Sequence, residues 1–263
     1  MKKILLAASV MCGVVGLCAN GSTNLPEQNL TIDFGVGLKN EYFSHGRHEL
    51  RKVYIPRAKV GYQIFDEVWM YTGIDSALGM AKDSLFNHVS PLVGISYNVT
   101  DEVKLDTRYL HHFYTKMPKK DRNGQPTDAK RYSNEISLGV VFDTFMKLSL
   151  GGSYDFEHKE ATLEGAAGYN FDLSFLISGL GVDMWAKVGN DCTKKPWGMA
   201  RLPKTHYYYY GAGADLAYKI NCARVKVGVG YEGNSANKKD WMNAGSGGKK
   251  NSFVLSASID CSF

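Results

Sequence analysis

The C-terminal stretch Phe253-Val-Leu-Ser-Ala-Ser-Ile-Asp-Cys-Ser-Phe263 alternates between apolar and polar residues along its length. Side chains of a β-strand point alternately to opposite faces, so this pattern predicts a strand with one apolar and one wet face. The wet face is polar except for Val254. The apolar face carries Phe253, Leu255, Ala257, Ile259, Cys261 and Phe263.

This ending resembles the terminal strand of bacterial outer-membrane β-barrels, which commonly close on a phenylalanine. The resemblance implies that the barrel-assembly machinery reads Phe253, Leu255, Ile259 and Phe263 as an assembly signal. The alternative at this point is an edge strand of a soluble β-sandwich, whose strands also alternate.

The first nineteen residues have the pattern of a secretory signal peptide. Lys2 and Lys3 precede an apolar run over residues 4–17, which is too short to span a bilayer and ends in small residues. We expect cleavage after Ala19, with lipoprotein processing at Cys18 as the alternative. The remaining 244 residues carry a formal charge of +3, which gives no support for nucleic-acid binding.

Alternating segments recur from Leu30 to Phe263 and add up to twelve strands, an even number as in single-chain bacterial barrels. We therefore predict an all-β fold, an antiparallel up-and-down transmembrane β-barrel over residues 30–263, preceded by a flexible periplasmic tail at 20–29. Short turns are expected near residues 66, 100, 144, 173 and 221, and longer loops at about 44–50, 80–87, 115–131, 157–160, 189–204 and 234–250.

Short turns on one side and long loops on the other match the asymmetry of outer-membrane barrels, whose short turns are periplasmic. We expect an integral protein of the bacterial outer membrane with both termini in the periplasm. Aromatic residues next to the short turns would form one interfacial girdle. The other girdle would consist of Tyr42, Tyr54, Phe113, Tyr132, Trp185, Tyr208, Tyr231 and Phe253.

Charged residues recur on the face of these strands that would point inward. Charges of both signs are costly against lipid, so they predict a wet lumen with weak charge selectivity. Many other inward positions are small, which leaves two interpretations open: an open bore, or room for long Arg and Lys side chains that plug it. The lumen-lining candidates are Lys39, Glu41, Arg57, Lys59, Asp75, Lys104, Asp106, Arg108, Glu135, Glu164, Asp183, Lys187, Asp215, Arg224, Lys226 and Glu232.

The leading functional hypothesis is a passive pore for small hydrophilic solutes. The alternative is a non-conducting structural or adhesive barrel whose long basic loops face the surface; a lipid hydrolase ranks third. Expected partners are outer-membrane lipids and lipopolysaccharide, whose phosphates the basic loops would attract. The segment 37–47 weakly resembles the first strand and loop of uncharacterised porin-like families, which supplies no functional residues.

His88 and Ser90 have a spacing that resembles the His-x-Ser of outer-membrane lipid A deacylases. Nucleophilic catalysis also needs a third group that orients the base, and the sequence assigns none. Pro91 stands where an asparagine would be expected, so we expect no enzyme. His111 and His112 are adjacent and would point to opposite faces, which argues for a girdle role and against a shared metal ion. No cofactor and no metal site are expected.

Three cysteines follow the signal segment, at a spacing that does not match a zinc site. Cys222 and Cys261 would lie near the periplasmic ends of the last two strands and are a candidate disulfide. Strict alternation places them on opposite faces, so the bond would need a β-bulge. Cys192 would then be unpaired.

Overall fold

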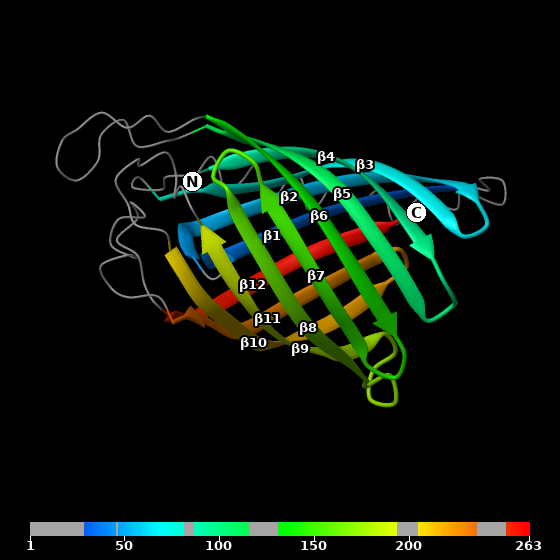
Figure 1. Cartoon of the computed structure of the whole chain (residues 1–263). Helices are drawn as coiled ribbons and strands as arrows, with labels where there is room; N and C mark the ends of the chain where they lie inside the picture. Colours follow the sequence, from blue (N-terminus) through cyan, green and yellow to red (C-terminus); the bar gives the residue numbers. More distant parts are fainter. Residues whose placement is uncertain (1–28, 46, 82–86, 116–130, 194–204, 236–250) are drawn as a thin grey trace.

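The computed structural model describes residues 29–45, 47–81, 87–115, 131–193, 205–235 and 251–263. In these ranges the chain forms twelve antiparallel strands that close into one barrel (Figure 1). Their bounds are β1 (Leu30–Ser44), β2 (Arg47–Phe65), β3 (Val68–Gly79), β4 (His88–Asn98), β5 (Val103–Tyr114), β6 (Tyr132–Asp143), β7 (Lys147–Asp155), β8 (Glu160–Asp172), β9 (Leu180–Thr193), β10 (Thr205–Ile220), β11 (Ala223–Asn234) and β12 (Asn251–Ser262).

The barrel closes between its first and last strands. The pairing of β1 with β12 runs from Asp33 opposite Ser262 to Lys39 opposite Ser256. At the end of this seam Ile32 and Phe263 exchange two backbone hydrogen bonds of 3.0 Å. Closure pairs the edge groups that an open sheet would expose, as a strand-built membrane protein requires. The predicted twelve-stranded up-and-down barrel is confirmed.

The short connections between strands lie together at one end of the barrel. The turns at 66–67, 99–102, 144–146 and 221–222, and the connection 173–179, share one end with Leu30 and Phe263. In Figure 1 the C-terminus lies at this end. We call it the turn end and the opposite end the loop end.

One predicted loop is wrong. Residues 44–50 were expected to be irregular, but β1 continues to Ser44 and β2 begins at Arg47, so the first two strands meet in a tight hairpin. The signal-peptide segment 1–19 and most of the predicted tail 20–29 lie outside the described residues. Among the described residues no helix has the length and apolar content to cross a membrane.

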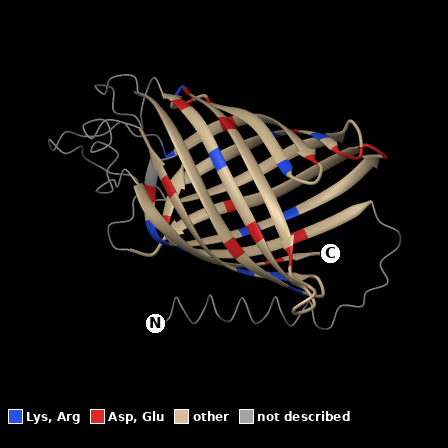
Figure 2. Ribbon diagram, turned by 90° about the horizontal axis from the view of Figure 1, so that it is seen from below, with Lys and Arg blue, Asp and Glu red and all other residues tan. Residues whose placement is uncertain are grey.

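The outer face of the barrel is apolar along the middle of the strands. Leu138, Val227 and Leu255 leave 63%, 61% and 59% of their surface exposed, although in water such side chains would be expected to be buried. Charged residues occur along the strands as well as in the turns (Figure 2). An apolar outside around a polar inside is the composition of a lipid-facing barrel.

Aromatic side chains gather near the turn end, where Tyr62, Phe65, Tyr97, Phe142, Phe145, Tyr169, Phe171 and Tyr218 are all exposed. The loop-end girdle needs two corrections. Trp185 points into the lumen, because its ring packs where a Cβ on Gly213 or Gly230 would stand. Tyr42 lines an internal cavity. Tyr208, Phe253 and Phe113 are exposed as expected.

The predicted assembly-signal residues lie in two different environments, one exposed and one buried. Phe253 and Leu255 are exposed, whereas Ile259 and Cys261 are buried in a cluster with Val36 and Ala223, against which Phe263 packs. Their role in assembly stays a prediction.

The cysteines of the described residues are thiols in this structure. The register places Ala223 opposite Cys261, and Cys222 is one residue farther along in the adjoining turn. Both sulfur-bearing residues belong to the same apolar cluster. Their disulfide stays a prediction, which the regular register does not favour, because no bulge turns Cys222 towards Cys261.

The two faces of β12 give a test of which side meets lipid. Leu255→Arg should destabilise the barrel by about 2–4 kcal/mol, the cost of a charge at the bilayer midplane. Ser256→Arg, one residue on, places the same guanidinium beside Asp215, which Ser256 already contacts at 3.3 Å. Denaturant titration in phospholipid vesicles measures both variants, and equal losses would contradict the assignment of faces.

Candidate functional site

The first hairpin leaves the barrel wall at the loop end. Pairing of β1 with β12 stops at Lys39, and pairing of β2 with β3 stops at Val53. Beyond these points the register continues between the two strands, from Glu41 opposite Arg51 to Ser44 opposite Arg47, and Lys52 O still accepts a backbone hydrogen bond of 2.8 Å from Met80 N. This segment, residues 40–52, is called the inner hairpin below.

Asn40 marks the point at which β1 leaves β12. Its side-chain amide donates to the carbonyl oxygen of Phe253 at 3.1 Å, and Leu255 N donates to its Oδ1 at 2.7 Å. The side chain thus takes over the hydrogen bonds that a continuing strand would make. The backbone of β12 stays satisfied at this edge although its neighbour has departed.

Two residues of the inner hairpin adopt left-handed backbone conformations, His45 with φ 45° at the tip and Lys52 with φ 50° at the base. Such angles are uncommon outside glycine and accompany sharp changes of chain direction. The register also shifts between Tyr42 and Phe43, as in a β-bulge, which bends a strand. The hairpin is therefore turned out of the wall at its base.

The hairpin points into the barrel, because its apolar side is buried. Leu50 and Val53 are fully buried and pack with Ala77 of β3, and Tyr42 packs against this cluster. Burying the Leu50 side chain of the hairpin stabilises the docked position by roughly 1.5–3 kcal/mol.

The hairpin tip reaches the far wall. His45 Nδ1 lies 3.1 Å from Glu160 Oε1 at the start of β8. The Tyr207 hydroxyl of β10 donates to the His45 carbonyl oxygen at 3.0 Å, and the Tyr209 ring lies 6.3 Å from the His45 ring. Since β8 and β10 lie across the barrel from β2 in strand order, the hairpin crosses the lumen.

The acidic surroundings of the tip alter the protonation of His45. Burial lowers its pKa, but the hydrogen bond and charge of Glu160, together with the charges of Glu135 and Asp191, outweigh burial and raise the pKa to about 9. The imidazolium is therefore the favoured form at neutral pH, and it is held by a charge-assisted contact to Glu160.

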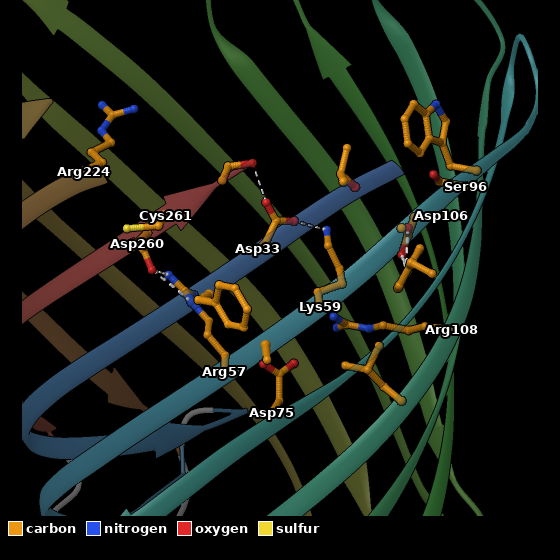
Figure 3. A pocket seen from close by; sticks show the side chains of 18 of the residues that line it. Asp33, Arg57, Lys59, Asp75, Ser96, Asp106, Arg108, Arg224, Asp260 and Cys261 are labelled. Carbon is orange, nitrogen blue, oxygen red and sulfur yellow. Dashed lines mark hydrogen bonds and ion pairs between the residues drawn. The ribbon is translucent and has the colours of Figure 1, made fainter. Parts of the chain in front are cut away.

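A wide vestibule opens below the hairpin, towards the turn end. Its volume is about 810 Å³, and it is lined by charged side chains of both signs from β1, β2, β3, β5, β11 and β12 (Figure 3). Asp33 pairs with Lys59 at 3.3 Å, and Arg57 pairs with Asp260. Most of its charges are thus near an opposite charge.

A second cavity of about 260 Å³ lies beside the hairpin at the loop end and has a different chemistry. Asp75 and Arg108 line both this cavity and the vestibule, so the two adjoin. Its charged and histidine lining consists of His45, Glu49, Asp75, His88, Arg108, His112, Glu135, Asp155, His158 and Glu160. We call it the histidine cavity.

Most of the lumen-lining candidates lie on these cavities or on a third one of about 200 Å³ near β10–β12. Those on a cavity are Lys39, Arg57, Lys59, Asp75, Lys104, Asp106, Arg108, Glu135, Asp215, Arg224 and Lys226. Their part in solute passage stays a prediction.

The other five candidates make contacts on the same face. Asp183 pairs with Arg224 at 2.6 Å and with Lys226 at 2.9 Å. Lys187 pairs with Glu232 at 2.6 Å, and Arg51 lies 3.9 Å from Glu41. Glu164 lies opposite Gly189 in the register, and Gly189 faces the buried Tyr209 ring.

The small inward residues make room for bulky neighbours. Gly35 makes room for Arg57, as one of the two sequence alternatives expected, and other glycines make room for aromatic rings, which neither alternative contained. A Cβ on Gly94 would collide with the Tyr71 ring, and one on Gly189 would collide with the Tyr209 ring. These glycines are therefore needed for close approach of bulky neighbours across the lumen wall.

Ser90 does contact a histidine, but not His88. Its Oγ lies 2.7 Å from Nδ1 of His112 on β5, and His112 Nε2 lies 3.5 Å from Glu135 Oε2 on β6. The girdle role expected of His112 is wrong, whereas His111 stacks with Tyr132 and packs against Phe113 as a girdle residue would. The third group, which would orient the base and which the sequence did not assign, is Glu135. Only the strand register brings it near His112.

The basic loops expected to face the surface, at about 115–131, 189–204 and 234–250, lie largely outside the described residues.

No family model and no curated protein matches the sequence. Solved structures resemble the fold. An outer membrane channel from Pseudomonas putida F1 matches over 93% of this chain and 98% of its own, at 9% identity and a TM-score of 0.48. The KdgM porin in complex with disordered oligogalacturonate matches over 89% of this chain and 99% of its own, at 11% identity and a TM-score of 0.46. LpxR from Salmonella typhimurium matches over 88% of this chain and 99% of its own, at 8% identity and a TM-score of 0.47.

The tip contacts predict how tightly the inner hairpin is docked. His45→Ala removes a charge-assisted contact worth about 1.5–3 kcal/mol, so amide exchange over residues 42–50 should become at least roughly tenfold faster. Hydrogen–deuterium exchange with mass spectrometry measures this change. His206→Ala, on the outer-facing side of β10, is the matched control and should leave the exchange unchanged; equal rates in wild type and His45→Ala would contradict docking through the tip.

Proposed function

We propose that this protein is an integral barrel of the bacterial outer membrane, with both termini in the periplasm, and a passive pore for small hydrophilic solutes. The inner hairpin restricts its loop-end mouth. The observation that carries the proposal is the polar lumen: the vestibule and the histidine cavity adjoin through Asp75 and Arg108. A barrel stabilised by a dry core would fill this space with apolar side chains.

The lining charges support weak selectivity. The vestibule carries the carboxylates Asp33, Asp75, Asp106 and Asp260 against the cations Arg57, Lys59, Lys104, Arg108 and Arg224. Such near balance creates little net potential over the path. The histidine cavity has several carboxylates and one arginine, so it adds a modest preference for cations at the loop end.

The restriction predicts that removing the hairpin opens the pore. Glu41 and Arg51 face each other across the hairpin, so an Asn-Gly turn can join them in place of residues 42–50. In planar bilayers this variant should conduct several-fold better than the wild type. A variant with a shortened 173–179 connection, which lines none of the three cavities, is the control and should conduct like the wild type.

The bilayer experiment also separates the pore from the non-conducting structural or adhesive barrel. Purified, folded protein that gives no channels with or without the inner hairpin would sink the pore proposal and favour the alternative. Folding is checked by heat-modifiable migration in gel electrophoresis.

A second candidate function, ester hydrolysis, is favoured by the Ser90–His112–Glu135 contacts alone. With the His112 proton on Nε2, its Nδ1 can accept the Ser90 hydroxyl proton as Oγ attacks an ester carbonyl. Glu135 would stabilise the imidazolium that forms, and His112 would return the proton to the leaving alcohol. Ser90 is only 1% exposed, so a substrate would have to enter through the histidine cavity. We therefore rank this function below the pore.

Ester hydrolysis has a direct test. If it occurs, Ser90→Ala should abolish turnover of a short-chain nitrophenyl ester, while Ser256→Ala on β12, four strands away around the barrel, should not affect it. Turnover that is absent in the wild type, or equal in both variants, rejects the enzyme.

A further inference from the structure

We propose that a divalent transition-metal cation of the zinc class binds at the tip of the inner hairpin, held by His45, Glu160 and Asp191. This inference goes beyond the pore and does not depend on conduction.

The three side chains already converge. One ligand atom from each, an imidazole nitrogen and two carboxylate oxygens, all lie within 4.8 Å of one another. Zinc bonds nitrogen and oxygen ligands at about 2.0–2.2 Å, which separates ligand atoms by roughly 3.3 Å around a tetrahedron. The His45 and Glu160 atoms are already 3.1 Å apart, close to this separation, and the Asp191 carboxylate would have to move closer to complete the site.

The ligands come from three separate elements. His45 stands at the hairpin tip, Glu160 begins β8, and Asp191 lies on β9 close to its loop end. Asp191 is fully buried, and its Oδ1 accepts a hydrogen bond of 2.5 Å from the Thr193 hydroxyl. Ordinary metal sites orient their carboxylate ligands through hydrogen bonds of this kind.

The charge of the site suits a dication. Two carboxylates and a neutral imidazole balance a doubly charged ion, which limits the cost of placing charges where water is scarce.

The surroundings favour a transition metal over calcium or magnesium. Four of the chain's seven histidines line the histidine cavity. Two of them are held by carboxylates: His158 Nδ1 lies 2.9 Å from Asp155 Oδ2, and His112 lies near Glu135. Carboxylate-held imidazoles are the usual partners of zinc, copper, iron and nickel, whereas calcium and magnesium prefer oxygen alone.

Metal binding would have a structural consequence. His45 is on the hairpin and its two partner ligands are on the wall, so one ion would join the inner hairpin to β8 and β9. A ligand that binds only the docked form stabilises it by mass action. Zinc should therefore slow amide exchange in the hairpin.

The test is calorimetric titration of chelator-washed, full-length mature barrel with zinc chloride at about pH 8, with proton release measured alongside, because metal binding displaces ligand protons. One zinc ion per chain is expected. His45→Ala and Asp191→Asn should each weaken binding by at least the roughly tenfold to hundredfold that loss of a supporting group costs. Added zinc should slow exchange over residues 42–50 in wild type and not in His45→Ala.

Two controls test whether zinc binds at this site. His206 on the outer side of β10 lies opposite the exposed Cys192, and this pair could itself attract zinc. His206→Ala should bind zinc like the wild type; loss of binding there and retention in His45→Ala would overturn the proposed site. Calcium bound as tightly as zinc, with no effect of His45→Ala, would also overturn it. Gel migration confirms that each variant folds.

Failure of this inference and failure of the pore are distinguishable. Channels in planar bilayers without zinc binding would reject the metal site and leave the pore standing. Zinc binding without channels would reject the pore and leave the metal site standing.

Discussion

The structure of the lumen depends on one constraint: the wall pairing of β1 with β12 stops at Lys39, that of β2 with β3 stops at Val53, and the two strands continue as a hairpin paired with each other. Strands that continued in the wall would need neighbours along their whole length. Here the Asn40 side chain satisfies the vacated edge of β12, and the left-handed Lys52 turns β2 inward. The apolar side of the hairpin is then buried on Ala77, and its tip reaches Glu160 on the far wall.

This hairpin divides the lumen into two chemical environments. Towards the turn end, charges of both signs stand close to one another, as Asp33 and Lys59 do. At the loop end, histidines and carboxylates surround a smaller cavity. The first environment suits the passage of hydrated solutes with little preference, whereas the second suits binding of a cation. In the pore that we propose, the open and plugged alternatives would describe the two ends of one barrel.

Much of the fold could be predicted from the sequence, because strict alternation, short turns and a terminal phenylalanine are local signals. The inner hairpin could not be predicted, since residues 40–52 lack strict alternation and their departure from the wall depends on pairing that stops on both sides. The contact of Ser90 with His112, and of His112 with Glu135, has the same cause: it depends on the registers of β4, β5 and β6. Glycines such as Gly94 could be interpreted as open space in the sequence because the ring of Tyr71 comes from another strand.

The position of the hairpin tip is the central claim, and cross-linking in intact membranes tests it most directly. In a background with Cys192, Cys222 and Cys261 replaced by serine, cysteines at positions 45 and 160 should be joined efficiently by a short bismaleimide. A cysteine at position 163, whose leucine points outward on the same strand, should not be joined to position 45. Equal cross-linking of both pairs, or none at 160, would contradict a hairpin docked across the lumen.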